Sequence, residues 1–349
     1  MFKKAALAGI CCFVLQPPLV GATVHTVRQD GTGDFLTIAD ALAAAASGDT
    51  VEVGPGTYAE GVTLDSALTI MSTDGSPTPI IEGAPTWEIH AGPSRIEALS
   101  IQNMIGRGLL IDSALATISD CEIYSNTAPW HPNPWGPDGW YEAGGGAYVK
   151  NGAVVEFDRC RFDDNFASSG AAAYVGSGSH VTLRQCRIID NTGWGYCAGV
   201  TVYNSTLDVI GCLFAGNRSR DEYEIVTGSP EGLDYENSTG SITSSTFYDP
   251  DHPNRVFWGT DVELRDSPTV PIERCIFASE DDSFPAIYYR NDPGPRSCNI
   301  YFKMFIWGDE LKADESMTER SLKTRRPPPN RACARIWPGR FRWGAIQCR

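Results

Sequence analysis

One short pattern recurs through the middle of this 349-residue chain. A cysteine is followed two places on by a large apolar residue, and three places after that by an asparagine. The pattern occurs as CEIYSN at Cys121, CRFDDN at Cys160, CRIIDN at Cys186 and CLFAGN at Cys212, while CIFASE at Cys275 lacks the asparagine. The copies from Cys160 to Cys212 are 26 residues apart, which indicates a repeat protein with one structural unit per copy.

Each copy has the alternation of a β-strand. Cys160 and Phe162 are apolar and Arg161 and Asp163 are polar, so one set points inward and the other outward. A second alternating run precedes each cysteine and a third follows each asparagine, which gives three strands per repeat. No apolar period of 3.6 residues runs through the unit, and a propeller blade needs about 40 residues. The repeat therefore predicts an all-β solenoid, the parallel β-helix, in which equivalent residues stack in ladders.

The stacking assigns roles to the cysteines and asparagines. The repeated cysteines are expected as buried free thiols in an interior ladder, because in-register side chains point parallel and stack better than they bridge. The asparagines are expected at a turn, in the left-handed backbone region, with hydrogen bonds to the next coil. The disulfide pattern of the cysteines outside the ladder stays open; these are Cys197, Cys298, Cys333 and Cys348.

The N-terminus has the features of a secretory signal. Lys3 and Lys4 precede the apolar run 5–15, and small residues end the segment at Ala22. No run of about 18 apolar residues follows, so a transmembrane helix is not expected. We expect a secreted protein, extracellular or at the cell surface, with residues 1–22 as signal peptide and 23–305 as β-helix. The net charge of −15 argues against nucleic acid as a partner of the body.

The last part of the chain differs from the rest. Residues 306–349 are predicted as a basic, proline-rich tail, irregular or disordered, because strand alternation fades after Phe302. From Arg320 onward there are nine Lys and Arg and no Asp or Glu. Such a tail either binds an anionic surface or is read in a shifted frame.

Two resemblances support the solenoid. The segment 30–58, DGTGDFLTIADALAAAASGDTVEVGPGTY, resembles the first segment of pectin-lyase-like right-handed parallel β-helix proteins, which include pectin methylesterases. In that group a short helix caps the solenoid, and here Ile38, Ala41, Leu42 and Ala45 give a short helix one apolar face. The strands after it would point Val51, Val53, Tyr58, Val62 and Leu64 inward. The repeats FDDN at Phe162, FAGN at Phe214 and GGAY at Gly145 are similar to those of polymorphic outer-membrane proteins, a class of surface adhesins.

The resemblance implies fold more strongly than activity. The esterase motifs DFIFG and LGRPW do not occur. The letters of the pectate lyase motif RxPxxR occur at Arg326–Arg331, within the proline-rich tail and without a strand pattern, which we interpret as a chance match.

An insertion in the repeat is the first candidate site. The gap from Cys121 to Cys160 is longer than one coil, and the excess is rich in aromatic residues and proline. Long loops of solenoids gather on one face and often carry function, and rigid aromatic rings suit stacking on sugars. The predicted carbohydrate-binding residues are Trp130, His131, Trp135, Trp140, Tyr141 and Glu142. The alternative is a loop whose rings pack against the coil.

Outward polar residues beside the insertion are the second candidate. Arg161 and Arg187 share one outward ladder, where they would anchor a sugar acid or act as a lyase base, or simply pair with Glu122 and Asp163. Asp164 and Asp190 stand at equivalent turns of adjacent coils, about 5 Å apart. Such carboxylates share a proton, bind a cation such as Ca²⁺, or separate in water. Asp163, Asp164, Arg161 and Arg187 are the weak catalytic candidates, and Asp164 and Asp190 the metal candidates; no other cofactor is expected.

These observations leave three functions open. The first is an exported β-helix protein that binds a polysaccharide or cell-surface glycan, since no catalytic set is identifiable. The second is a polysaccharide lyase or glycoside hydrolase of the pectin-lyase-like class. The third is a structural or adhesive surface solenoid. Oligomeric state does not follow from the sequence.

Overall fold

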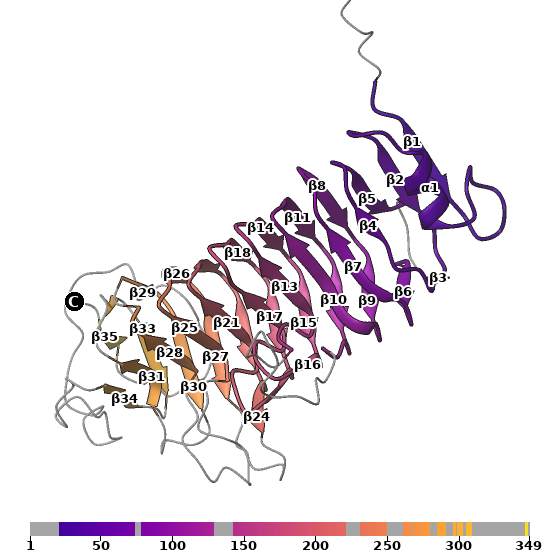
Figure 1. Ribbon diagram of the computed structural model, residues 1–349. Coiled ribbons are helices and arrows are strands. Elements are labelled where there is room, and N and C mark those ends of the chain that lie inside the picture. Colours follow the sequence, from indigo (N-terminus) through magenta and orange to yellow (C-terminus); the bar gives the residue numbers. More distant parts are fainter. Residues whose placement is uncertain are drawn as a thin grey trace, which may run out of the picture.

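The computed structural model describes residues 21–73, 78–128, 142–220, 231–249, 261–267, 269–279, 285–290, 296–297, 299–302, 305–308 and 346–347. Within these ranges the chain winds into a stack of coils that build three long sheets (Figure 1). A short amphipathic strand cannot bury its apolar face alone, so each coil depends on its neighbours for a core. The predicted all-β parallel β-helix is confirmed.

The first long sheet, sheet A, runs from the N-terminal coil to the C-terminal coils. It contains β1 (Val24–Val27), β2 (Thr50–Val53), β5 (Thr69–Ser72), β8 (Ser94–Glu97), β11 (Leu115–Ser119), β14 (Val154–Asp158), β18 (His180–Arg184), β22 (Thr206–Ile210), β26 (Thr239–Thr243), β29 (Ile272–Glu273) and β32 (Arg296–Ser297).

Sheet B follows sheet A in each coil. It contains β3 (Thr57–Tyr58), β6 (Ile80–Glu82), β9 (Ser100–Gln102), β12 (Glu122–Tyr124), β15 (Arg161–Asp163), β19 (Arg187–Ile189), β23 (Leu213–Ala215), β27 (Thr246–Asp249), β30 (Ile276–Ser279), β33 (Asn299–Phe302) and β35 (Ile346–Gln347). The pairing of β33 with β35 is antiparallel, whereas the coil-to-coil pairings are parallel.

Sheet C completes the coil. It contains β4 (Thr63–Leu64), β7 (Pro85–Ile89), β10 (Ile105–Asp112), β13 (Ala147–Lys150), β17 (Ala173–Val175), β21 (Val200–Tyr203), β25 (Leu233–Glu236), β28 (Val262–Arg265), β31 (Pro285–Arg290) and β34 (Phe305–Gly308).

A fourth, shorter sheet departs from the predicted three strands per repeat. Sheet D consists of β16 (Phe166–Ala167), β20 (Thr192–Trp194) and β24 (Arg218–Arg220), each following the repeat asparagine. Ala167 packs with Ala128 and Ala171 in a small core separate from the main one. The extra strand was not apparent in the sequence because it is only two or three residues long.

The turn from sheet A to sheet B has the same form in successive coils. Two residues separate β14 from β15, and the first, Arg159, has a φ of 52°. The second is Cys160, which is 1% exposed. The equivalent first residues from β8 to β30 also have positive φ; they are Ala98, Asp120, Gln185, Gly211, Ser244 and Arg274. A left-handed residue turns the chain sharply, so the next side chain points into the core.

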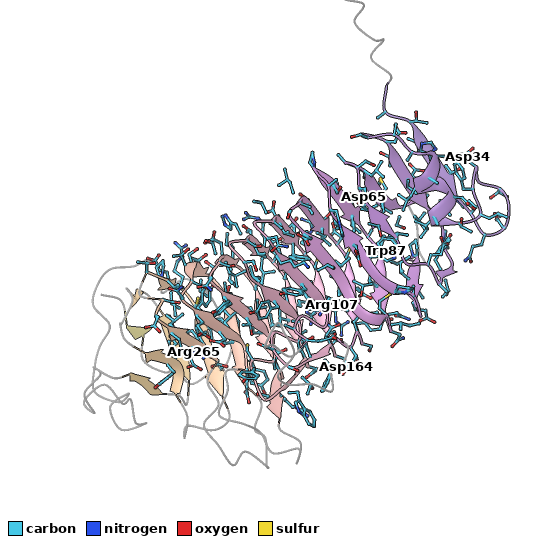
Figure 2. The ribbon with its side chains drawn as sticks, in the orientation of Figure 1. Asp34, Asp65, Trp87, Arg107, Asp164 and Arg265 are labelled. Carbon is cyan, nitrogen blue, oxygen red and sulfur yellow. The ribbon has the colours of Figure 1, made fainter. Side chains whose placement is uncertain are left out.

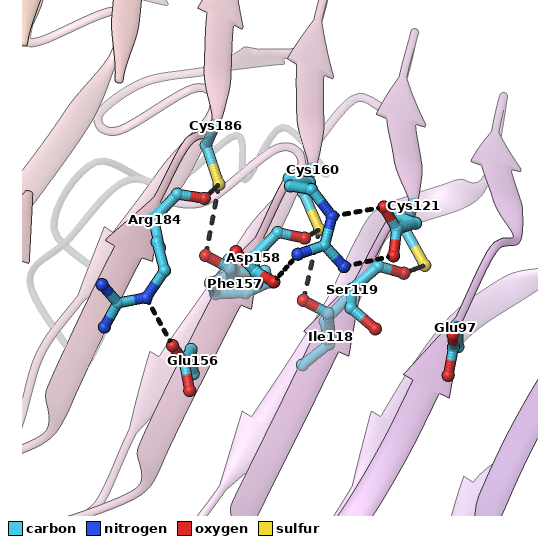
Figure 3. A network of polar contacts seen from close by, with 12 residues as sticks. Glu97, Ile118, Ser119, Cys121, Glu156, Phe157, Asp158, Cys160, Arg184 and Cys186 are labelled. Carbon is cyan, nitrogen blue, oxygen red and sulfur yellow. Dashed lines mark hydrogen bonds and ion pairs between the residues drawn. The ribbon is translucent and has the colours of Figure 1, made fainter. Parts of the chain in front are cut away.

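The repeated cysteines are buried free thiols, as predicted. Cys121, Cys160, Cys186, Cys212 and Cys275 form no disulfide, and Cys197 is a buried free thiol as well. Each thiol of the ladder lies within hydrogen-bond distance of main-chain carbonyls (Figure 3), for example Cys186 with the carbonyl of Phe157 at 3.3 Å. Burial raises the pKa of the Cys160 thiol well above its ordinary value. Cys298, Cys333 and Cys348 lie outside the described residues.

The repeated asparagines form a second interior ladder, which corrects the predicted turn geometry. Asn126, Asn165 and Asn191 are fully buried, and the left-handed residue is the one before each of them. Asn165 Nδ2 donates to Asn191 Oδ1 at 3.0 Å, and Asn191 Nδ2 donates to Asn217 Oδ1 at 2.9 Å. A side-chain amide suits this buried position because it both donates and accepts hydrogen bonds. Each asparagine therefore finds hydrogen-bond partners in the asparagines of the adjacent coils. The predicted bonds between coils are therefore present, but on inward side chains.

The N-terminal cap agrees with the prediction. Helix α1 (Ile38–Ala44) is capped by Thr37, whose side chain accepts from the main-chain N–H of Asp40, and it buries Ile38 and Ala41. The predicted inward residues Val51, Val53, Tyr58, Val62 and Leu64 are buried. The outer edge of β1 is covered rather than open, because the main-chain N–H of Phe35 donates to the carbonyl of Thr26 at 3.0 Å.

The predicted boundaries of the signal peptide, the β-helix and the tail fall only partly within the described residues. Residues 1–20 of the expected signal peptide lie outside them. Strand β34 (Phe305–Gly308) spans the predicted boundary at residue 305, and β35 is the described part of the tail beyond it. The segment Arg326–Arg331 lies outside the described residues.

Candidate functional site

Variation in coil length is concentrated at one corner of the solenoid, where the chain passes from sheet B to sheet C. We call this the B–C corner. From β12 to β28 the connections there span residues 125–146, 164–172, 190–199, 216–232 and 250–261. From β8 to β30 sheet A passes to sheet B through two residues, and the two earlier A–B connections span 54–56 and 73–79. Insertions that map to one side of a repeat protein mark its usual binding side. The corner is therefore where a site is best sought.

Asp164 and Asp190 are brought to equivalent points of this corner, as predicted. Strands β15 and β19 pair with Asp163 opposite Ile189, so the aspartates that follow occupy adjacent coils. Both have left-handed φ, 51° and 52°. At the next coil Gly216 takes the same place, and a Cβ there would lie only 2.2 Å from Asp190 Oδ1. The Asp190 carboxylate thus leans over a glycine.

The electrostatics distinguish Asp190. Partial burial, together with the charges of Asp163 and Asp164, raises the pKa of Asp190, against the opposing effect of Arg218 and Arg161. Asp164 accepts a hydrogen bond from Ser125 Oγ at 3.3 Å. Adjacent carboxylates in one environment favour retention of a proton by one of them.

The predicted arginines lie on the outer face of sheet B beside these carboxylates. Arg161 pairs with Asp163 of its own strand, which was one of the two expected partners. Arg161 and Arg187 stand opposite one another in register, and Glu122 is the neighbour of Arg161 on the other side. Like charges directly opposite one another on a sheet are destabilising, and the ion pair of Arg161 with Asp163 offsets part of this repulsion.

The predicted cation site at Asp164 and Asp190 stays a prediction. Among the described residues no three His, Cys, Asp or Glu side chains gather as a metal-binding group. Two carboxylates with the hydroxyl of Ser125 supply fewer oxygen ligands than Ca²⁺ takes, so water would complete the shell.

Aromatic side chains at the same corner were missed by the sequence argument. Phe166 of β16 and Trp194 of β20 lie edge to face, with ring centroids 6.1 Å apart. Tyr196, two residues beyond, is 47% exposed. A Cβ at Gly193 would lie 2.3 Å from the carbonyl oxygen of Tyr196, so this glycine lets the chain fold back tightly and present the tyrosine. The sequence feature that could have predicted these rings is an aromatic residue shortly after a repeat asparagine. It occurs in NF at Asn165 and in NTGWGY at Asn191.

Of the predicted binding residues in the aromatic insertion, only Glu142 at its C-terminal end lies within the described residues. Trp130, His131, Trp135, Trp140 and Tyr141 lie outside the described residues. Glu142 Oε2 is 3.8 Å from Arg107 Nη2, and Arg107 Nε donates to the carbonyl of Ala143 at 3.2 Å. Arg107 stands at a register shift in β10, between Ile105 and Leu109. The exit of the insertion is therefore held by Arg107 of β10, a residue labelled in Figure 2.

Residues 89–229 match the family described as "Right handed beta helix region". This match covers the repeats and agrees with the parallel coils seen in the structure. The resemblance to pectin-lyase-like right-handed β-helix proteins is thereby supported for the fold. No curated protein sequence matches the chain.

Several solved structures are similar to the chain at low identity. Pectate lyase Pel9A is 8% identical over 88% of this chain and 86% of its own, with a TM-score of 0.45. The pectin methylesterase from Aspergillus niger is 12% identical over 86% of this chain and 90% of its own, with a TM-score of 0.41. PemA from Erwinia chrysanthemi, another pectin methylesterase, is 13% identical over 86% and 93%, with a TM-score of 0.41.

The chemistry available at the corner is that of hydrogen bonding and stacking. Carboxylates accept from hydroxyl groups, guanidinium groups donate, and the rings of sheet D offer flat apolar surface. Within the described part of the chain no helix is long and apolar enough to cross a membrane.

Proposed function

We propose that the protein binds a polysaccharide at the B–C corner. The binding surface would consist of Phe166, Trp194 and Tyr196 on the aromatic side and Asp164 and Asp190 on the polar side. The observation that carries the proposal is the edge-to-face pair of Phe166 and Trp194, which comes from adjacent coils directly beyond the two aspartates. Apolar faces of sugar rings stack on aromatic rings, while their hydroxyls need acceptors at the rim.

The solenoid favours a polymer over a small ligand. Equivalent residues recur with each coil, about 4.8 Å apart, so a chain molecule lying along the axis meets similar groups repeatedly. The charges also balance locally, since Asp163, Asp164 and Asp190 lie near Arg161, Arg187 and Arg218. The corner therefore suits neutral sugars as well as charged ones. Export, inferred from residues 1–22, would bring the protein to extracellular polysaccharides.

The proposal is tested by polysaccharide retention in affinity electrophoresis, with neutral and acidic polymers in the gel. Trp194→Ala and Tyr196→Ala should each weaken retention by about tenfold, which corresponds to the loss of one stacking contact. Leu115→Ala is the matched control, because Leu115 is a 51% exposed apolar residue on sheet A. If the rings only pack against the coil, both variants would lose thermal stability and leave retention unchanged, and the proposal would be wrong.

Glycoside hydrolysis is a second candidate, favoured by the raised pKa of Asp190 beside Asp164. A carboxylic acid that keeps its proton can protonate a leaving oxygen, while a second carboxylate acts as base or nucleophile. In this scheme Asp190 is the acid and Asp164 its partner.

Release of reducing ends from a polysaccharide panel tests the hydrolytic scheme. Asp190→Asn should abolish it, and the wild-type rate should fall as pH rises through the raised pKa of Asp190, because the acid then loses its proton. An unsaturated product would indicate a lyase instead, and retention without cleavage would leave the binding proposal alone.

A further inference from the structure

The N-terminal end of the solenoid, where α1 and β1 lie together, contains a buried carboxylate (Figure 1). Asp49 lies between α1 and β2 and is 6% exposed. Its main chain is held on both sides, because its N–H donates to the carbonyl of Ala46 at 3.0 Å and its carbonyl accepts from the N–H of Thr69 at 3.0 Å. A carboxylate removed from water needs donors from the protein, so its partners show which groups this position binds.

Three donors converge on the Asp49 carboxylate. The main-chain N–H of Thr23 donates to Oδ1 at 2.8 Å, and the main-chain N–H of Ala46 donates to Oδ2 at 2.8 Å. His25 Nε2 lies 3.0 Å from Oδ2, and His25 is the titratable group that faces Asp49 from β1. The hydrogen bond from Thr23, with those from His25 and Ala46, lowers the pKa of Asp49 to about 2 against the effect of burial. The carboxylate is therefore charged at neutral pH.

The register of the first two strands explains why Thr23 reaches Asp49. Val24 pairs with Thr50, so Thr23 and Asp49 precede the two strands at equivalent positions. The carbonyl of Thr23 accepts from the N–H of Thr50 at 2.9 Å, so both main-chain polar groups of Thr23 are hydrogen bonded. The two residues before it are exposed, and a Cβ added at Gly21 would meet nothing within 4 Å. The main chain directly before Thr23 is therefore accessible to a peptidase.

The same peptide bond ends the segment expected as a signal peptide. Small residues precede it and end at Ala22, as a signal peptidase requires. Hydrolysis of the Ala22–Thr23 bond consumes one water. The water oxygen joins the carbonyl carbon of Ala22, which leaves as a carboxylate, and both water protons end on the nitrogen of Thr23. The nitrogen that donates to Asp49 thereby changes from an amide to an α-ammonium group.

We propose that Asp49 is the binding site for the α-ammonium group of the exported chain, which begins at Thr23 after cleavage of the Ala22–Thr23 bond. A hydrogen bond between two charged groups is stronger than one from a neutral amide to the same carboxylate. Cleavage therefore stabilises the first coil and the cap that covers its edge, and it does so only in the processed chain. This inference does not depend on the polysaccharide-binding proposal.

The first test measures the terminal amine. A chain beginning at Thr23 and a chain beginning at Ala22 are each released from a cleavable fusion; in the second the ammonium group is displaced by about 3.8 Å along the chain. Acetic anhydride labels the neutral amine, and mass spectrometry of the N-terminal peptide gives the rate. At pH 7 the Thr23 amine should react roughly tenfold more slowly, because the ion pair with Asp49 favours its protonated form. Equal rates would overturn the inference.

The second test measures thermal stability. At pH 7 the chain beginning at Thr23 should have a midpoint about 2 °C above that of the chain beginning at Ala22. The ion pair raises the pKa of the amine in the folded state. The gain should therefore be full below the ordinary α-amino value of about 8 and should disappear as pH rises through the raised value.

Two substitutions assign both effects to one carboxylate. Asp49→Asn should remove the differences in labelling and in midpoint. Asp34→Asn is the matched control and should keep both, because Asp34 also accepts a main-chain N–H of β1, that of Thr26 at 3.0 Å. Differences that survive Asp49→Asn would overturn the inference. The labelling of the two unsubstituted chains remains decisive even if Asp49→Asn does not fold.

The processing step is tested on the full-length chain. Expressed in a secreting bacterial host, it should be exported with Thr23 as its first residue, as read by N-terminal sequencing. Any other first residue would overturn the inference. Retention of polysaccharide is read in a separate assay, so failure here is distinguishable from failure of the proposed function.

Discussion

Two connections of the same coil behave in opposite ways. From β8 to β30 the A–B turn is two residues long, and a left-handed residue is followed by a buried leucine, cysteine or serine. The connection at the B–C corner varies in length: it spans residues 164–172 in one coil and residues 125–146 in another. The first connection positions two interior ladders, whereas the second lies outside them. A solenoid therefore fixes the turn that sets its core and lets the opposite corner change, which is where binding residues can accumulate.

The largest effect is expected from placing a charge in the fixed ladder. Cys186 is 1% exposed, so Cys186→Asp buries a carboxylate without a partner and should prevent folding. Cys186→Ala should cost on the order of 1 kcal/mol, as a small cavity does. Circular dichroism and urea unfolding measure both. If Cys186→Asp folded with near wild-type stability, the A–B turn would not be the connection that sets the core.

The asparagine ladder should come next. Asn191 Nδ2 donates to the carbonyl of Phe162 at 3.1 Å and to Asn217 Oδ1, and Asn191 Oδ1 accepts from Asn165. Asn191→Ala leaves several buried groups unsatisfied and should lower the free energy of unfolding by about 3 kcal/mol. Thr206→Ala, which removes an exposed hydrogen bond to Thr239, is the control and should cost less than about 0.5 kcal/mol.

A glycine in the A–B turn allows the contribution of the backbone conformation to be tested separately from side-chain packing. Gly211 has a φ of 66°, and a Cβ there would touch only the Gln185 side chain, at 3.8 Å. Gly211→Ala should therefore cost about 1 kcal/mol through the left-handed conformation rather than through a clash. Gln185→Ala, at the same position one coil earlier, should change stability little, because Gln185 already has that conformation. Equal costs in urea unfolding would show that the turn is not held by its backbone.

The smallest effect is expected at the variable corner. The pKa of Asp190 is raised above its ordinary value of 3.8, so the folded state binds more protons than the unfolded state between the two values. Its contribution to stability therefore falls as pH rises through that window. Asp190→Asn should leave the thermal midpoint unchanged below pH 3 and raise it by about a degree or less at pH 7. A lower midpoint at pH 7 would mean that the carboxylate stabilises the corner instead.

The predictable part of the structure was the part that repeats. The 26-residue spacing predicted the stacked strands, the buried cysteines and the neighbours Arg161 and Arg187, because each depends only on position within one coil. The asparagines were placed at the right turn with the wrong side-chain direction. Asparagine is common both in left-handed turns and in buried amide ladders, and the pattern alone does not distinguish them.

The candidate sites depended on the stacking of different coils. Sheet D was hidden in strands too short to alternate, so Phe166 and Trp194 could not be paired from the sequence. The pairing of Tyr203 with Glu236 on sheet C was hidden because the chain inserts different lengths between these strands, which removes any constant spacing.

By itself, the sequence determined the parallel β-helix, its helical cap and the inward residues of the A–B turn. These follow from local alternation and from a period that every coil shares, since a coil can bury its apolar face only against a like neighbour. The tertiary structure decided which further residues meet on the outside: Phe166 with Trp194 at the corner, and Tyr203 with Glu236 on sheet C. Those meetings are set by the register of parallel strands, and register is a property of the stacked coils, because it is fixed by hydrogen bonds between residues distant in the chain.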